Sequence, residues 1–173
     1  NRIGQVKGGK MKAGGTKAAM WLWQQMLADG LTPQQAGGIL GNLDQESGFS
    51  PSADEAGGPG RGIAQWGEGA RWDQLLAFAK VNKMDPMELG TQYAFMKHEM
   101  DTGAYKFSWA DFNAQKDSVQ GSAKYFGSNY EGFGIEGSRN SDADYWYSKF
   151  KKVPAGTKKA DDKIGRASCR ERV

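Results

Sequence analysis

The segment from Thr32 to Gly48 carries the strongest structural signal in the chain. Thr32 precedes Pro33, which is a favoured order of helix N-cap and first helical residue. Apolar residues such as Ile39 and Leu43 then recur at helical spacing, and Gly48 can take the left-handed conformation that ends many helices. The sequence therefore predicts a helix over residues 33–47 with one apolar face.

Similar patterns predict further helices, so the expected fold class is mainly α, with no strong strand signal. We expect Thr16 to cap the first helix, Gly30 to end it, and Asp85-Pro86 to open a later one. The expected helices cover residues 16–28, 33–47, 71–82, 85–100, 118–127 and 138–151, with an aromatic connection after Met100. Residues 48–70 are rich in Gly, Pro, Ser and Asp, which predicts one long functional loop.

The 173 residues fit one domain better than two. We expect a flexible lead-in at 1–15, a single helical domain at 16–151, and a mobile tail at 152–173. Residues 164–173 resemble translated read-through of a sequencing adapter, and they hold the single cysteine, Cys169. Because the chain begins at Asn1 and not at Met, we expect it to be a fragment or processed piece of a larger polypeptide.

Charge and composition narrow the function classes. The net charge is +3, and it falls to +1 without the last ten residues, which is too weak to favour nucleic acid. One histidine, His98, and one cysteine leave little material for a thiol nucleophile, a Ser–His triad or a metal site. No apolar run reaches the length of a membrane span. We therefore expect a carboxylate catalyst that needs no cofactor and no metal.

Glu46 is the strongest candidate for that carboxylate. With 100° per residue and Ile39 at zero, Leu43 falls at about 40°, Glu46 at about −20° and Asp44 at about 140°. Glu46 thus flanks the apolar face, whereas Asp44 lies on the solvent face. Burial and the negative end of the helix dipole are both expected to raise the pKa of Glu46. A carboxylic acid that stays protonated suits general acid catalysis on a glycoside.

Two neighbouring motifs resemble those of the phage tail lysozyme family. They are Gly41-Asn42-Leu43-Asp44-Gln45-Glu46-Ser47-Gly48 and Gly62-Ile63-Ala64-Gln65-Trp66. Goose-type lysozymes and lytic transglycosylases have a related Glu-Ser and Gln signature. Weaker similarities follow at Arg71, Leu75, 92–95, Glu99, Tyr130, Glu131, Arg139 and Ala143, so the resemblance spans about residues 16–150. It implies a single lysozyme-like domain in which residues 48–70 form the active-site loop.

The resemblance also implies roles for individual residues. Glu46 would be the general acid, and Gln65 would lie beside it in a cleft and bind substrate or water. Trp66 would stack on a sugar or wall the Glu46 pocket, and a core role is the alternative for it. Tyr93 and Tyr130 are candidate substrate contacts.

Several assignments remain open on the sequence alone. Glu131 would bind sugar hydroxyls or pair with Arg139, and Glu99 is expected to be a buried brace. A second catalytic carboxylate is not obvious. Asp54 is preferred, with Glu55, Glu68 and Asp73 as alternatives, and the separation of the two carboxyl groups would decide the mechanism.

The function expected from these observations is hydrolysis of the bond between N-acetylmuramic acid and N-acetylglucosamine in peptidoglycan. A lytic transglycosylase, which forms 1,6-anhydro products, has the same signature. A non-catalytic virion or cell-wall-binding module is the third alternative. The expected partners are peptidoglycan glycan strands and other domains of a phage tail protein, and the expected location is the virion or the cell exterior.

Overall fold

The structure, a computed structural model, describes residues 9–102, 108–131 and 137–156, without the side chain of Glu131. It is mainly helical, as the sequence predicts, and has one small antiparallel hairpin in the long loop. The elements are α2 (Thr16–Ala28), α3 (Pro33–Ser47), β1 (Gly60–Arg61), β2 (Trp66–Gly67), α4 (Arg71–Val81), α5 (Leu89–Thr102), α6 (Trp109–Gln115), α7 (Val119–Phe126), the π-helix η1 (Gly127–Glu131) and α8 (Gly137–Phe150).

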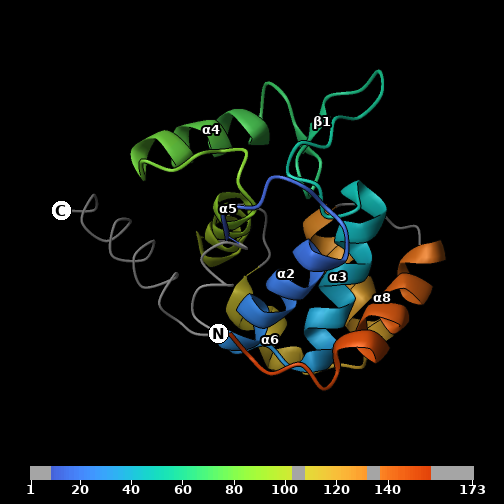
Figure 1. The fold of residues 1–173 in the computed structure, drawn as a ribbon. Coiled ribbons are helices and arrows are strands. Elements are labelled where there is room, and N and C mark those ends of the chain that lie inside the picture. The colour runs from blue at the N-terminus through green and yellow to red at the C-terminus, as the bar shows by residue number, and fades with distance from the viewer. Residues whose placement is uncertain (1–8, 103–107, 132–136, 157–173) are drawn as a thin grey trace.

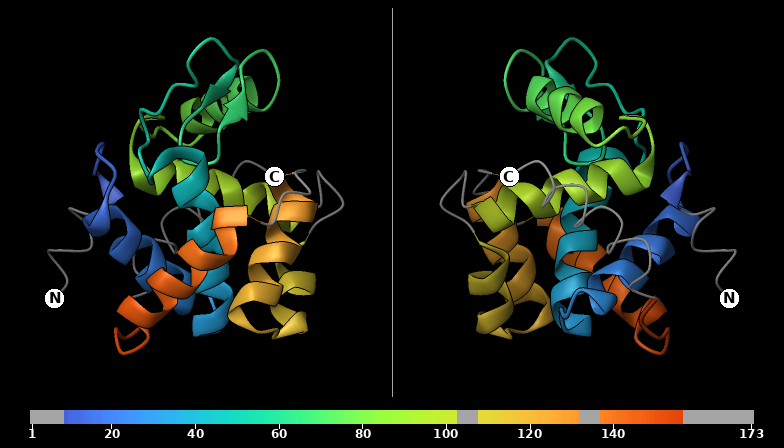
Figure 2. Two further views of the ribbon diagram at one scale, coloured as in Figure 1. Left: turned by 90° about the vertical axis from the view of Figure 1, so that its right-hand side faces the viewer. Right: turned by 90° about the vertical axis from the view of Figure 1, so that its left-hand side faces the viewer.

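Helix α3 lies at the centre of the helical part and packs against α2, α7 and α8. In Figures 1 and 2, α4 and the hairpin form the upper part of the molecule, while α2, α3, α7 and α8 form the lower part. The carboxyl end of α3 points toward the loop that carries the hairpin (Figure 1). The last turn of α3 therefore joins the two parts, and this is where Glu46 lies.

Two glycines let other helices approach α3 closely. A Cβ atom on Gly38 would lie 2.6 Å from the backbone nitrogen of Ala123 in α7. A Cβ atom on Gly41 would lie 2.6 Å from both the nitrogen of Ala143 and the carbonyl oxygen of Arg139 in α8. Backbone atoms cannot move aside as a flexible side chain can, so these positions require glycine for the observed packing.

The prediction for α3 is confirmed at both ends. The Thr32 side chain accepts a hydrogen bond from the Gln35 backbone, and the Gln35 side chain accepts one from the Thr32 backbone. Gly48 is left-handed, with φ 58°. For α2 the predicted cap is wrong, because Gly15 takes the N-cap position and Thr16 is the first helical residue.

Two other predictions need correction. Helix α5 begins at Leu89 and not at Asp85. The Asp85 side chain accepts a hydrogen bond from the Met87 backbone, and the Asp85 carbonyl oxygen accepts one from the Glu88 backbone. Asp85-Pro86 thus forms a turn before the helix. The expected aromatic connection contains helix α6, whose N-cap Ser108 accepts a hydrogen bond from the Asp111 backbone.

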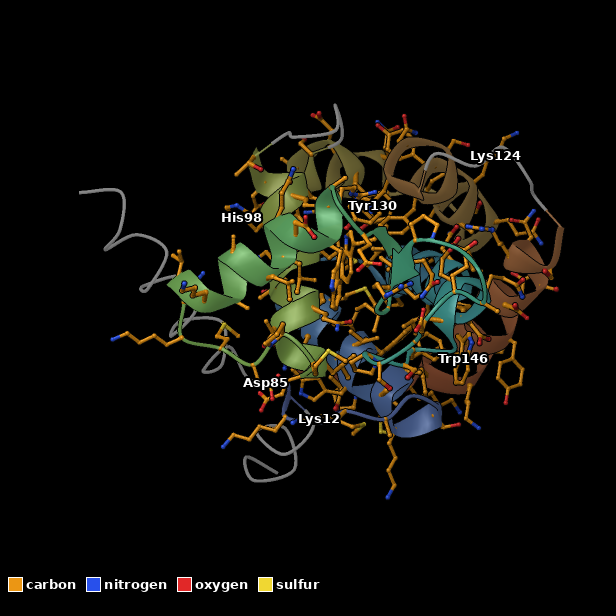
Figure 3. All side chains as sticks on the ribbon, turned by 90° about the horizontal axis from the view of Figure 1, so that it is seen from above. Lys12, Asp85, His98, Lys124, Tyr130 and Trp146 are labelled. Atoms are coloured by element: carbon orange, nitrogen blue, oxygen red, sulfur yellow. The ribbon has the colours of Figure 1, made fainter. Side chains whose placement is uncertain are left out.

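Residues 9–15, which the sequence assigns to a lead-in, contact the start of α5 and the end of α3. The carbonyl oxygen of Met11 accepts a hydrogen bond from the Leu89 backbone at 2.8 Å. Lys12 forms an ion pair with Asp85 at 2.9 Å, and these two residues are labelled side by side in Figure 3. Gly15 then donates to the carbonyl of Gly48, at the end of α3.

Candidate active site

Glu46 lies in the last turn of α3, where the helix meets the long loop. Its neighbour Ser47 donates a hydrogen bond to the carbonyl oxygen of Ile63 at 2.7 Å. Glu46 precedes Ser47 by one residue and Gln65 follows Ile63 by two, so both candidate groups flank this one bond. The structure therefore brings the two sequence motifs together at the end of α3.

The Glu46 carboxyl group is nearly buried, with its side chain 11% exposed, and it has a charged partner. Nη2 of Arg139, from the first turns of α8, donates to its Oε1 at 2.5 Å. Nη1 of the same guanidinium donates to Oδ1 of Asn42 at 2.9 Å. Arg139 thus holds Glu46 and Asn42 together with its two terminal nitrogens.

Asn42 is itself fixed from two sides. Its Nδ2 donates to the carbonyl oxygens of Gly38, one turn earlier in α3, and Ala123 in α7. The side chain is fully buried, so all of its polar contacts lie inside the protein. Asn42 therefore provides a rigid anchor for the Arg139 guanidinium.

The sequence alone did not pair Arg139 with Glu46. It proposed Glu131 as the Arg139 partner, and the side chain of Glu131 lies outside the described residues. A guanidinium next to a carboxyl group stabilises the carboxylate. The sequence also placed Asp44 toward solvent, yet its Oδ2 accepts a hydrogen bond from Trp146 at 2.9 Å.

Loop residues 54–68 are organised around Arg61. Its guanidinium lies 2.7 Å from Asp54 and 2.9 Å from Glu68, across the β1–β2 hairpin. The Asp54 side chain is 67% exposed, which makes it the more open of the two proposed catalytic carboxyl groups. Glu55 instead accepts a hydrogen bond from the backbone of Gly60.

Gln65 is half-buried and has a left-handed backbone, with φ 50°. Its Nε2 donates to the carbonyl of Gly62, and a Cβ atom on Gly60 would lie 2.7 Å from its Oε1. With these contacts the Gln65 side chain braces the loop from Gly60 to Gln65. The side chains of Gln65 and Glu55 fill the space beside Gly60, so a larger residue at this position would clash with them.

Three aromatic residues that were candidates for substrate contact are buried. Trp66 is 0% exposed, Tyr93 1% and Tyr130 3%. Side chains this buried present no exposed ring face on which a sugar can stack. In this structure the three residues therefore pack in the core. The prediction differs because aromatic residues serve a core as well as a binding surface.

Trp66 and Tyr130 belong to a buried polar network centred on Glu99. Oε1 of Glu99 accepts hydrogen bonds from Trp66 Nε1 at 2.9 Å and from the Tyr130 hydroxyl at 2.6 Å. Arg71 donates to both carboxylate oxygens, and its guanidinium lies over the Tyr130 ring. Figure 3 shows Tyr130 between α4 and the hairpin. Glu99 is thus the buried brace that the sequence predicts, tying β2, α4, α5 and η1 together.

Tyr93 lies in a separate cluster. Its hydroxyl donates to Asp29 Oδ2 at 2.5 Å, and Asp29 also pairs with Lys97 at 3.4 Å. The Tyr93 ring packs edge-on against Trp21 of α2. These contacts join α2 to α5. They give the Tyr93 hydroxyl a structural role within the protein.

Among the residues that the structure describes, no three His, Cys, Asp or Glu side chains are grouped so that they could hold a metal ion. Within the same residues, no helix is long and apolar enough to cross a membrane.

A sequence model of one protein family, described as phage tail lysozyme, matches residues 17–150. This range begins in α2 and ends at the last residue of α8, so it includes Glu46, the long loop and Arg139. No curated protein matches the chain.

Proposed function

Because this chain belongs to the phage tail lysozyme family, we propose that it is a muramidase that uses Glu46 as its general acid. The family implies a lysozyme-like peptidoglycan hydrolase in a phage tail setting. The proposed bond is the one between N-acetylmuramic acid and N-acetylglucosamine. The observation that carries the proposal is a nearly buried carboxyl group at the end of α3, beside the loop and held in place by Arg139.

In the proposed reaction, neutral Glu46 donates its proton to the glycosidic oxygen as the bond from that oxygen to C1 breaks. The bonding electrons stay on the oxygen, and an oxocarbenium-like sugar forms. A water molecule then attacks C1, and Asp54 takes its proton. Asp54 is open to solvent and is held by Arg61 at 2.7 Å, which suits a group that must meet a water molecule. Gln65 flanks the same junction and is proposed to orient substrate or water.

The test is mass spectrometry of purified peptidoglycan after digestion by the wild type, Glu46→Gln, Asp54→Asn and Glu88→Gln. Glu88 precedes α5, outside the proposed site, so its substitution controls for loss of a carboxylate. Reducing muropeptides are expected from the wild type and Glu88→Gln. Loss of a general acid or base lowers the rate by about 10²–10⁴-fold, which is the expected result for Glu46→Gln and Asp54→Asn.

The products also separate the alternatives. Anhydro-muropeptides from the wild type would reassign the chain as a lytic transglycosylase. A wild type that binds several cell-wall types but releases no soluble product would identify a binding module. Undiminished cleavage by Glu46→Gln would exclude Glu46 as the acid.

A further inference from the structure

The pair formed by Arg139 and Glu46 does more than fill the space between α3 and α8. Arg139 is 17% exposed and Glu46 11%, so both charges have left most of their water. Buried charges are retained at a cost, and that cost is offset here by two directed hydrogen bonds from one guanidinium. A planar fork fixed at Asn42 has little freedom, so it also fixes the carboxyl group that it holds.

The contact is specific to one oxygen of Glu46. Nη2 of Arg139 bonds to Oε1, and among the described residues no group bonds to Oε2. In the neutral acid, the oxygen that accepts from Arg139 is the carbonyl oxygen and the other carries the proton. The arrangement therefore selects Oε2 as the proton-bearing atom.

Arg139 also acts on the charge that develops during the reaction. As the proton leaves Oε2 for the glycosidic oxygen, Glu46 becomes a carboxylate beside a fixed cation. This interaction is stronger in the transition state than in the ground state, which is the condition for it to accelerate the chemical step. Loss of this cation is therefore expected to change the pH dependence of the reaction.

We propose that Arg139 is the positioning residue of the active site: it aims Oε2 of Glu46 at the glycosidic oxygen and stabilises the carboxylate that forms. This inference rests on the proposed function of Glu46. It assigns to α8 a part in the reaction that the two sequence motifs on α3 and the loop do not show.

Other ionisable groups lie on the elements around Glu46, and none of the described ones bonds to it. Asp44 accepts from Trp146, Asp142 from Gln45, and Asp144 from Gln120, while Asp29 pairs with Lys97. The remaining ones are Lys17 on α2, Lys124 and Tyr125 on α7, Tyr130 on η1, Tyr145, Tyr147 and Lys149 on α8, and Asp54, Glu55, Arg61 and Glu68 in the loop. Among the described residues, Arg139 is therefore the cation whose substitution is expected to change the pH profile of the reaction.

The test compares Arg139→Gln and Arg139→Lys with the wild type, using kcat and the pH profile of kcat/KM on soluble peptidoglycan fragments. Lys149→Gln is the matched control, because it removes an exposed cation from the same helix. We expect kcat to fall by about 10²-fold in Arg139→Gln, as for a misplaced catalytic group. The alkaline limb should move to higher pH, since a cation bonded to the acid is lost.

Arg139→Lys keeps the charge but cannot fork to Asn42 and Glu46 together. Its alkaline limb should stay near that of the wild type, with kcat between the wild type and Arg139→Gln. An Arg139→Gln enzyme that loses activity with an unmoved limb would overturn the proposal and leave Arg139 a purely structural residue. Glu46→Gln, run in parallel, isolates the other failure: full activity in that variant refutes the proposed acid itself. Thermal unfolding of each variant verifies that it is folded at the assay temperature.

Discussion

Substituting Gly41 with alanine tests how closely α3 and α8 must approach. The added Cβ would lie 2.6 Å from the nitrogen of Ala143 and from the carbonyl oxygen of Arg139. Ordinary contacts of such atoms begin at about 3.4 Å, so the two helices would have to separate by nearly 1 Å. Because both clashing atoms are backbone, no side-chain rotation can relieve the overlap.

The expected change in the free energy of unfolding combines two opposing effects. Alanine in a helix interior is more favourable than glycine by about 1 kcal/mol. Overpacking a well-filled core costs about 1–3 kcal/mol, and a clash with two backbone atoms lies at the upper end of that range or beyond it. We expect a net loss of about 2 kcal/mol for Gly41→Ala. In a domain of this size that lowers the melting temperature by about 6–10 °C.

The assay is thermal unfolding followed by circular dichroism, with Gly121→Ala in α7 as the control. A Cβ atom on Gly121 meets mainly the Asp117 carboxylate, which is exposed and can move aside at the cost of its hydrogen bond from the Ser118 backbone. This variant should therefore lower the melting temperature much less than Gly41→Ala. If Gly41→Ala melts no lower than Gly121→Ala, the close packing of α3 on α8 is not required for the fold. A folded Gly41→Ala protein should also lose activity, because the clash moves the turn that carries Arg139.

Two further predictions concern the other charged contacts. Arg71→Met leaves the carboxylate of Glu99, which is 2% exposed, without its cation, and unfolding in urea should show a loss of about 3 kcal/mol. A loss below about 1 kcal/mol would mean that this pair does not hold the hairpin. The hydrogen bond from Lys12 lowers the pKa of Asp85, so the stabilisation it gives is present above the ordinary carboxyl range and disappears as the pH falls below about 4. Relative to the wild type at the same pH, Asp85→Asn should therefore exchange the Leu89 amide faster at pH 6, and this difference should shrink as the pH falls below the ordinary carboxyl range. A ratio of the two rates that does not change with pH would refute the anchor.

The predictions from sequence succeeded where the cause is local. The ends of α3 follow from Thr32, Pro33 and Gly48, each of which acts within one turn of its own position. The start of α5 was misplaced, although Asp85 is also a local signal. An Asp before Pro can either cap a helix or close a turn, and the sequence does not distinguish the two.

The candidate site could be predicted only in part, for a physical reason. Glu46 was proposed because it flanks an apolar face, ends a helix and stands in a motif that resembles that of the family, and each of these is visible within a short stretch of sequence. Its partner Arg139 is 93 residues away, and no periodicity links the two. Trp66 and Tyr130 fit either a core or a sugar-binding surface until the fold places them, and the fold puts both against Glu99.

The spacing within the first motif has a physical explanation in the α3–α8 contact. Asn42 and Glu46 are four residues apart, so they lie one above the other on the same face of α3. One guanidinium can therefore reach both side chains, with one terminal nitrogen bonded to Asn42 and the other to Glu46. Gly41, beside Asn42, removes the side chain that would keep α8 too far away for this bond. Gly-Asn-x-x-x-Glu can therefore be read as one structural unit, in which glycine admits the helix, asparagine anchors its arginine, and the arginine aims the glutamate.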